Sequence, residues 1–317
     1  MRYDDFRRSD DIEDRRGDDS GGGIGGGGGI GGGGLGLPIG GGGGLGIGTL
    51  IVLGLVGYAF GIDPRILIGG AQILTGGSQA PSYQTDRTSA STKTGAPTDE
   101  MGNMIAGILG EIDDRWGEYF KASGQTYTGP RIVLFRNVTN GGRCGMAQSA
   151  MGPFYCPPDR KIFLDTGFFR EVETRFHGCS GNACKFTAAY IIAHEAGHHV
   201  QNLLGILPKV TRQQQVSSKA DSNALQVKVE LQADCLSGVW VNLEEKKRPG
   251  FLEAGDIDAA LTTASAIGDD TLQRQATGRV VPDSFTHGSA AQRKRWFMNG
   301  YQQGTVQACN TFGAGSL

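Results

Sequence analysis

Forty-three consecutive residues without a charged side chain, from Ser20 to Ile62, constrain this chain more than any other feature of its sequence. Between Gly21 and Gly48, 20 of the 28 residues are glycine, and there is no Gly-X-Y period that would build a collagen helix. A stretch so rich in glycine has high chain entropy and few side chains with which to form a core. The sequence therefore divides into an unusual front part and about 220 residues that could fold into one or two small domains.

The second half of this uncharged stretch predicts a transmembrane helix. Residues 45–62 form an apolar run near the length that a helix needs to cross the hydrocarbon layer, and Asp63 and Arg65 follow it. Glycines within the run would weaken a helix in water but are tolerated in a membrane. The run starts too far from Met1 to be a cleaved signal peptide. We therefore expect one membrane span at residues 45–62.

The regions beside this span differ in composition. Residues 1–44 are expected to be a disordered tail, because their first 19 residues mix five arginines with eight acidic residues and glycines follow. The arginines favour a cytoplasmic N-terminus, which would place the C-terminal part outside the cytoplasm. Residues 63–98 are rich in Ser, Thr, Gln, Gly and Pro and are expected to be a flexible linker. The remaining residues, 99–317, are the expected globular domain.

The globular part carries almost no net charge. From Glu100 onward it has 22 basic and 21 acidic side chains, without the basic surface that nucleic-acid binding requires. A nucleic-acid partner is therefore not expected.

All six cysteines follow the predicted span, at Cys144, Cys156, Cys179, Cys184, Cys235 and Cys309. An even number on one side of a membrane suits an oxidising compartment, so we expect disulfides. Closeness in sequence suggests two pairs, Cys144 with Cys156 and Cys179 with Cys184, which leaves Cys235 for Cys309. Six cysteines nevertheless allow 15 connectivities. Free buried thiols are the alternative, and a zinc site is disfavoured because no Cys-x-x-Cys spacing occurs.

The sequence His194-Glu195-Ala196-Gly197-His198 lies in an apolar run that is compatible with a helix. Residues i and i+4 share a helix face, so His194 and His198 can bind one zinc ion through neutral imidazole nitrogens. Glu195 would lie beside the water that zinc activates and could act as general base and then general acid. A pair of packed or surface histidines is the alternative. The next residue, His199, is expected in a hydrogen-bonded or core role and not as a ligand.

A catalytic zinc site needs a third protein ligand and one open position. Glu230 and Asp234 are again four residues apart, in a segment that predicts a second helix. Glu230 could be the third ligand, while Asp234 could accept a hydrogen bond from the free N–H of a ligating histidine and so fix its tautomer. Two solvated acids are the alternative, which the apolar neighbours disfavour because an unpaired buried acid is costly.

Together, His194-Glu195-x-x-His198 and Glu230-x-x-x-Asp234 resemble the zincin metallopeptidases that have a glutamate as third ligand. More closely, the chain resembles the bacterial "putative neutral zinc metallopeptidase" family, whose members combine a charged N-terminus, a glycine-rich stretch, one membrane span and a zincin-like domain. Other matching blocks are residues 152–157, 189–201 and 286–293. The resemblance implies a zinc metallopeptidase in the bacterial inner membrane, with a periplasmic or extracytoplasmic catalytic domain, and leaves the substrate open.

The resemblance also suggests a second catalytic residue. In zincins with this ligand set, a histidine or tyrosine from the C-terminal part can donate a hydrogen bond to the tetrahedral oxyanion. His287 is the only histidine after the second predicted helix, and we assign it this role. A surface or helix-capping histidine is the alternative.

The expected fold is an α+β, zincin-like domain, in which a small antiparallel or mixed sheet packs on the active-site helix and the C-terminal part is helical. Strand-like composition occurs at residues 131–138 and 161–165. The latter could be the edge strand that binds an extended substrate, or an internal strand. Helices are expected at residues 100–122, 187–204, 219–247, 256–277 and 289–302.

Three functions remain open at this point. The first is a membrane-anchored zinc endopeptidase with one zinc ion, in which Glu195 takes the proton of a zinc-activated water that attacks a peptide or protein substrate. The second is a non-catalytic, membrane-tethered binding module with structural zinc, which would not need Glu195. The third is zinc-dependent hydrolysis of a non-peptide amide, for instance in the cell wall. The ligands alone do not distinguish peptides from other amides.

Overall fold

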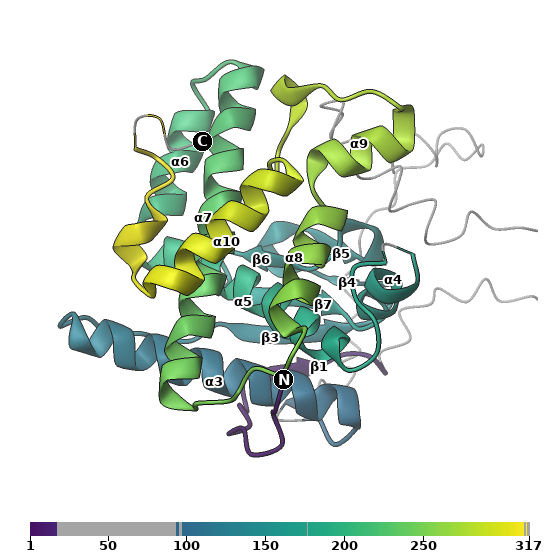
Figure 1. Ribbon diagram of the computed structural model, residues 1–317, viewed down its shortest axis with the longest axis vertical. Helices are drawn as coiled ribbons and strands as arrows, with labels where there is room; N and C mark the ends of the chain where they lie inside the picture. Colours follow the sequence, from purple (N-terminus) through teal and green to yellow (C-terminus); the bar gives the residue numbers. More distant parts are fainter. Residues whose placement is uncertain (18–92, 95–96, 176, 314, 316–317) are drawn as a thin grey trace, which may run out of the picture.

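The computed structural model describes residues 1–17, 93–94, 97–175, 177–313 and 315. They form an α+β fold in which a small mixed sheet is combined with a helical C-terminal part, as predicted (Figure 1).

The sheet has five strands in the order β2-β1-β3-β7-β6. These are β1 (Ile12–Asp14), β2 (Lys93–Thr94), β3 (Arg131–Phe135), β6 (Phe154–Cys156) and β7 (Lys161–Asp165). Strands β1 and β7 run parallel to β3, whereas β2 and β6 run antiparallel to their neighbours. The predicted strand at 161–165 is therefore internal, and β6 is the edge strand. A separate hairpin joins β4 (Val138–Asn140) and β5 (Met146–Gln148).

The helices are α3 (Glu100–Ala122), α4 (Phe168–Thr174), α5 (Ala183–Leu203), α6 (Ile206–Gln214), α7 (Lys219–Lys247), α8 (Asp256–Ala266), α9 (Asp269–Thr277) and α10 (Ala290–Gln303). The expected helices at 100–122 and 219–247 are confirmed, and each begins after a capping side chain, Asp99 or Ser218. The single helix expected at 256–277 is wrong, because Gly268 separates α8 from α9. A side chain at Gly268 would lie 2.6 Å from the main-chain nitrogen of Ala290.

The two faces of the sheet pack differently because side chains alternate along each strand. Ile132 and Leu134 of β3 belong to the main core, together with the buried faces of α3, α5 and α7. Val133 and Phe135 point to the opposite face, where they form a smaller cluster that includes residues of the β4–β5 hairpin. The sheet thus places its edge strand β6 next to α5, the helix that carries the histidine motif.

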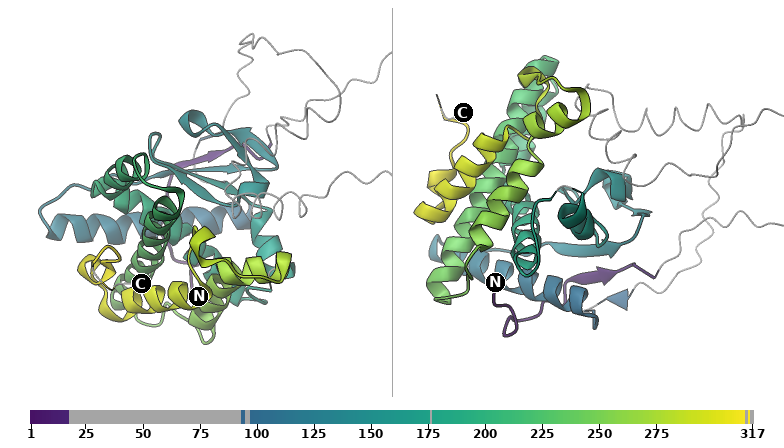
Figure 2. Two further views of the ribbon diagram at one scale, coloured as in Figure 1. Left: turned by 90° about the horizontal axis from the view of Figure 1, so that it is seen from above. Right: turned by 45° about the vertical axis from the view of Figure 1, so that its right-hand side comes forward.

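Residues 1–17 belong to this fold, so the prediction of a disordered charged tail is wrong for them. Ile12 is fully buried within β1, and Phe6 is buried against the main core. The charges between these apolar residues find partners; for example, Arg7 forms an ion pair of 2.8 Å with Asp114 on α3. Figure 2 shows this purple segment lying beside α3 and within the sheet. The prediction of disorder rested on charge density alone and did not take into account the apolar residues, which are buried in the fold.

No helix among the described residues is long and apolar enough to cross a membrane. The predicted span at 45–62 lies outside the described residues, as does most of the predicted tail and linker, although residues 93–94 of that linker form β2. A single crossing between residues 17 and 93 would place β1 and the helical domain on opposite sides of a membrane. The docking of β1 and a single crossing by residues 45–62 therefore exclude each other in one chain, whichever way the chain is oriented. The span and the orientation of the chain stay predictions.

The predicted disulfide pairing is confirmed. The three bonds join Cys144 to Cys156, Cys179 to Cys184, and Cys235 to Cys309, and no free cysteine occurs in the described part of the chain. The first bond fastens the end of β6 to the loop of the β4–β5 hairpin. The third fastens the C-terminal segment to the middle of α7.

Candidate metal centre

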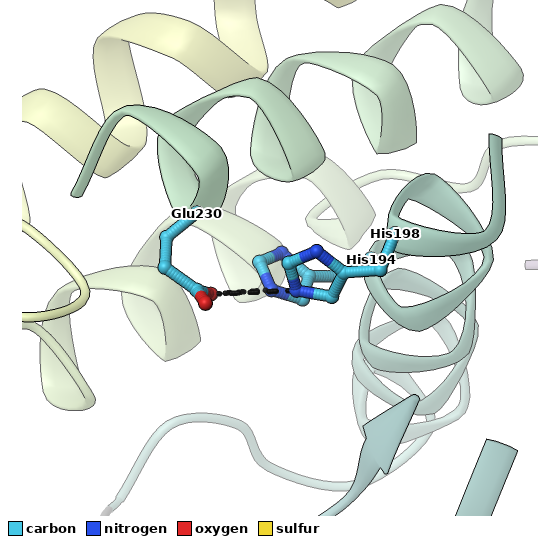
Figure 3. A group of neighbouring side chains, drawn as sticks. All are labelled: His194, His198 and Glu230. Carbon is cyan, nitrogen blue, oxygen red and sulfur yellow. Dashed lines mark hydrogen bonds and ion pairs between the residues drawn. The ribbon is translucent and has the colours of Figure 1, made fainter. Parts of the chain in front are cut away.

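Two helices, α5 and α7, supply the three predicted metal ligands. They approach closely at Gly197, where a side-chain carbon would lie 3.0 Å from the main-chain oxygen of Ala233. This close approach brings Glu230 of α7 toward His194 and His198 of α5, and Figure 3 shows the three side chains converging from the two helices. Gly197, inside the histidine motif, thus allows the two helices to pack closely at this point.

The spacing of the three side chains fits a zinc ion. Nε2 of His194 lies 3.2 Å, and Nε2 of His198 3.5 Å, from the same oxygen, Oε2, of Glu230. One donor atom from each residue lies within 4.8 Å of the others. Two donors on a tetrahedral zinc ion, at bond lengths of about 2.0–2.1 Å, stand about 3.3 Å apart. The structure therefore brings the predicted ligands together, and both histidine–glutamate separations are close to the value expected for two ligands of one zinc ion.

The charges of the three residues favour a cation at their centre. Burial lowers the pKa of His194, but the charge and hydrogen bond of Asp234, together with Glu230 and Glu195, outweigh this effect and raise the pKa to about 10. Burial also lowers the pKa of His198, but the charge and hydrogen bond of Glu230 and the charge of Glu195 together outweigh it, so the pKa is raised. Burial raises the pKa of Glu230, whereas the two histidines lower it further, so the carboxylate is ionised. A divalent cation would take the place of the protons that the histidines otherwise hold.

Asp234 orients His194, as predicted from the sequence. Its Oδ1 lies 2.9 Å from Nδ1 of His194, which leaves Nε2 directed at Glu230. Asp234 is fully buried and also accepts hydrogen bonds from the Tyr190 hydroxyl at 2.7 Å and from Nε and Nη2 of Arg293 at 2.8 and 2.9 Å. Burial raises the pKa of Asp234, but the charges and hydrogen bonds of Arg293 and His194 together outweigh it, so the pKa is lowered.

Glu195 lines the same cavity as the three ligands and is largely buried. Burial raises its pKa, although the charges of His198 and His194 oppose the shift. A carboxyl with a raised pKa exchanges protons closer to neutral pH, which suits a general base. Glu195 thus lies in the same cavity as the three predicted ligands, with a pKa raised mainly by burial.

His287 also lines the cavity, where a third of its side chain is exposed. Its Nδ1 lies 3.3 Å from Oδ1 of Asp269, the first residue of α9. Oδ2 of Asp269 accepts hydrogen bonds from the main-chain N–H groups of Thr286, His287 and Gly288, at 2.6–2.9 Å. These bonds fix the loop, so His287 is held at the wall of the cavity by a buried carboxylate.

His199 is not a ligand, in agreement with the sequence-based expectation. Its Nε2 lies 2.6 Å from the carbonyl oxygen of Thr128, which can only accept, so Nε2 carries the proton. Nδ1 then accepts a hydrogen bond of 2.9 Å from the hydroxyl of Tyr155 on β6. Asn202 also donates to that hydroxyl, at 3.0 Å. These contacts fasten the edge strand to the helix that carries the ligands.

A cavity of about 400 Å³ opens in front of the metal ligands. Residues 150–155, which lead into and include part of β6, line one wall. Leu207 and Val210 of α6 and Val229 of α7 contribute apolar side chains elsewhere in the lining. The charged or ionisable residues of this lining, apart from Tyr190 and the more distant Tyr155, belong to the centre itself. Outside the centre, the lining of the cavity is therefore largely uncharged.

Four residues that contact the centre were not assigned this role from the sequence. They are Tyr190 and Arg293 beside Asp234, Asp269 beside His287, and Gln201, whose Oε1 lies 2.9 Å from Nδ1 of His198. Arg293 closes a sequence block that resembles the family, and Tyr190 lies one helical turn before His194, but neither observation reveals a contact with Asp234. The contact depends on α10 crossing α7, which no local pattern encodes.

Comparison with known proteins gives the family. The family described as "Putative neutral zinc metallopeptidase" matches residues 1–312. The chain belongs to this family. The match to this zinc metallopeptidase family starts at residue 1 and so includes the segment that forms β1. The family name also implies zinc as the ion for the three ligands.

Curated relatives cover nearly all of the chain. The "Uncharacterized protein YpfJ" of Escherichia coli strain K12 is 44% identical over 313 residues, which is 99% of each chain. The "Uncharacterized protein Rv2575" of Mycobacterium tuberculosis strain H37Rv is 40% identical over 266 residues, covering 81% of this chain and 85% of its own. No solved structure gives a significant match.

Proposed function

We propose that this member of the zinc metallopeptidase family hydrolyses peptide bonds in a zinc-dependent reaction. The observation that carries the proposal is the position of Glu195, which lines the cavity beside His194, His198 and Glu230. A structural metal site has no use for an additional buried acid with a raised pKa. A zincin-like fold is part of this proposal and is supported by the two ligand helices and the edge strand next to them.

Each group of the centre has a defined task in this reaction. When bound, zinc supplies Lewis acidity, which makes water nucleophilic near neutral pH and polarises a carbonyl. His194, His198 and Glu230 hold the ion. Glu195 takes a proton from the attacking water and delivers it to the leaving amine. His287, held by Asp269, donates a hydrogen bond to the oxygen on which negative charge develops.

The edge strand indicates how a substrate would lie. Among the described strands, β6 ends the sheet beside α5, and Phe154 and Tyr155 line the cavity. An extended peptide can add to such an edge through main-chain hydrogen bonds. The apolar side chains of the lining would then favour uncharged substrate residues. Peptides or proteins with apolar residues near the cleaved bond are therefore the proposed substrates.

The test compares the full chain with its Glu195→Gln variant, and uses Glu173→Gln, an exposed glutamate on α4, as the matched control. We expect about one zinc ion per chain in all three proteins by metal analysis. Cleavage of a peptide mixture, followed by mass spectrometry, should fall about 10²–10⁴-fold in Glu195→Gln alone. Unchanged cleavage in Glu195→Gln would contradict the mechanism, and zinc retained after combined His194→Ala and Glu230→Ala changes would contradict the ligand assignment.

The same experiment separates the other functions. Zinc without hydrolysis of peptides, but with release of amines from cell-wall fragments, would indicate an amidase. Zinc without either reaction would indicate a binding module. Attachment to a membrane through residues 45–62 stays a prediction, and fractionation of cells with and without that segment tests it.

A further inference from the structure

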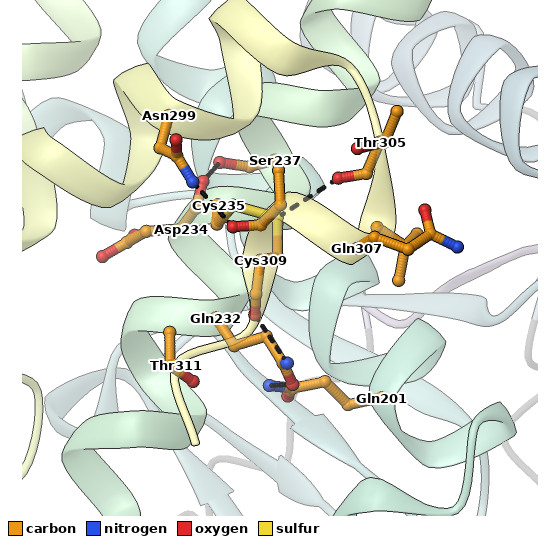
Figure 4. Close-up of a disulfide and its surroundings, with 12 residues drawn as sticks. Gln201, Gln232, Asp234, Cys235, Ser237, Asn299, Thr305, Gln307, Cys309 and Thr311 are labelled. Atoms are coloured by element: carbon orange, nitrogen blue, oxygen red, sulfur yellow. Dashed lines mark hydrogen bonds between the residues drawn. A yellow bond between two sulfur atoms is a disulfide. The ribbon is translucent and has the colours of Figure 1, made fainter. Parts of the chain in front are cut away.

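Two buried glutamines connect His198 to the C-terminal segment. Nδ1 of His198 lies 2.9 Å from Oε1 of Gln201, and Nε2 of Gln201 donates to Oε1 of Gln232 at 3.0 Å. Nε2 of Gln232 donates in turn to the carbonyl oxygen of Cys309 at 2.8 Å. Figure 4 shows Gln201 and Gln232 side by side below Cys309. We call these three hydrogen bonds the glutamine relay.

The direction of the relay is set at its far end. A main-chain carbonyl only accepts, so Gln232 must turn its amide nitrogen to Cys309 and its oxygen to Gln201. Gln201 must then present its nitrogen to Gln232, and the carbonyl oxygen of Val229, at 2.8 Å, requires the same orientation. The oxygen of Gln201 therefore faces His198, whose Nδ1 must carry the proton. This tautomer leaves Nε2 with the lone pair that a metal ion needs.

A disulfide holds the carbonyl from which this direction starts. Cys309 is bonded to Cys235, and both are fully buried. Cys235 directly follows Asp234, the residue that orients His194. The same disulfide is thus linked to both histidines. It is linked to His194 through Asp234, the neighbour of Cys235, and to His198 through the glutamine relay.

We propose that Gln201 and Gln232 are positioning residues that hold His198 as its Nδ1–H tautomer, and that the Cys235–Cys309 disulfide fixes the carbonyl which directs them. The inference rests on the proposed function, because it assumes that His198 binds zinc. It extends that function, since it makes the covalent state of two cysteines outside the cavity a determinant of zinc affinity. His194 has a charged partner in Asp234, whereas His198 depends on neutral amides and hence on their direction.

The first experiment measures zinc affinity of the full chain by competition with a chelator. Loss of an outer hydrogen-bond partner of a ligand commonly lowers metal affinity about 10–100-fold. We expect about 100-fold for Gln201→Met and about 10-fold for Gln232→Met, since Val229 still directs Gln201 in the latter. Thr311→Val is the matched control, because it removes a side-chain hydrogen bond of 2.7 Å to the carbonyl of Lys228 from the same C-terminal segment. It keeps the main-chain N–H of residue 311, which donates to the Cys309 carbonyl at 2.9 Å.

The second experiment reads the tautomer directly. In the zinc-loaded protein, the imidazole N–H protons of His194 and His198 should both be visible by NMR. Gln232→Met should speed solvent exchange of the His198 proton and leave that of His194 unchanged. Equal changes at both histidines, or in Thr311→Val, would show general loosening and overturn the positioning role.

The disulfide is tested by replacing both Cys235 and Cys309 with alanine. We expect zinc affinity to fall about as far as in Gln232→Met, with faster exchange at His198. Affinity within twofold of the wild type would overturn the role of the disulfide, and unchanged affinity in Gln201→Met and Gln232→Met would overturn the relay. Wild-type protein that takes up no zinc would instead overturn the metal centre itself.

Discussion

Removal of the Arg293 guanidinium should strongly destabilise the fold, because it leaves the Asp234 carboxylate buried with fewer partners. Arg293 makes two charge-assisted hydrogen bonds to this fully buried group. Each such bond contributes about 1.5–3 kcal/mol, so their loss amounts to about 3–6 kcal/mol. Breaking a buried ion pair by removing one partner costs about 3–5 kcal/mol. Tyr190 and His194 still donate to Asp234, so we expect about 3 kcal/mol for Arg293→Met.

The assay is urea unfolding of the oxidised protein, followed by circular dichroism in the presence of a chelator, so that zinc binding does not contribute. Lys294→Met, an exposed neighbour on α10, is the matched control and should change stability by less than about 0.5 kcal/mol. In the double variant Arg293→Met/Asp234→Asn, neither member of this ion pair is left as an unpaired charge. Its loss of stability should therefore be about 2 kcal/mol smaller than the sum of the losses in the two single variants. Strict additivity, or a loss below about 1 kcal/mol in Arg293→Met, would refute the reasoning.

Three further outcomes follow from the packing. Gly300→Ala should lower stability by about 2–3 kcal/mol and reduce Tm, because the new methyl group would collide with a main-chain oxygen of α7; a calorimetric Tm at the wild-type value would contradict that close crossing. Burial raises the pKa of Asp113 from 3.8 to about 7, so wild-type stability should fall as pH rises from about 4 to 7, by no more than about 4 kcal/mol. Asp113→Asn should flatten this decline in urea titrations at several pH values, and an unchanged slope would assign it to other groups. Residues 1–17 pack on the helical domain, so both must lie on the same side of any membrane. Single cysteines at two exposed positions, Arg8→Cys and Lys294→Cys, should therefore react alike with a membrane-impermeant maleimide in intact cells. Labelling of only one of them would show that β1 is not docked there.

The ligands of the metal centre could be predicted from the sequence because their chemistry follows helix periodicity. His194 and His198, and again Glu230 and Asp234, are four residues apart, so one helical turn places each pair on one face. Two histidine nitrogens and a glutamate oxygen are a common ligand set for zinc, so these residue types indicate zinc. The link between Asp234 and His194 followed from the need of a ligating histidine for a partner, and the structure places the two 2.9 Å apart.

The supporting residues could not be predicted, since their contacts join segments far apart in sequence. Arg293 reaches Asp234 because α10 packs closely on α7 at Gly300. Gln201 contacts Gln232 because α5 and α7 approach closely at Gly197. The break at Gly268 has a similar origin, because local helix propensity there is overruled by the neighbouring N-terminus of α10.

The prediction for residues 1–17 was wrong because it relied on local composition. The charges of this segment dominate any local average, yet its few apolar residues are buried and many of its charges pair with groups about a hundred or more residues away.

The parallel pairing of β1 with β3 has a consequence for the order in which the protein assembles. Residues 12–14 leave the ribosome before the strand that they join, because residues 132–134 follow about 120 residues later. The ammonium group of Met1 contacts Asp256 at 2.6 Å, so the first residue meets part of its site only after most of the chain has been made. Pairings between such distant segments form slowly, because the intervening loop must close before the contacts stabilise it. Strand β1 therefore waits for β3, and until the two strands pair, the edge of β3 that β1 covers is open to pairing with other chains.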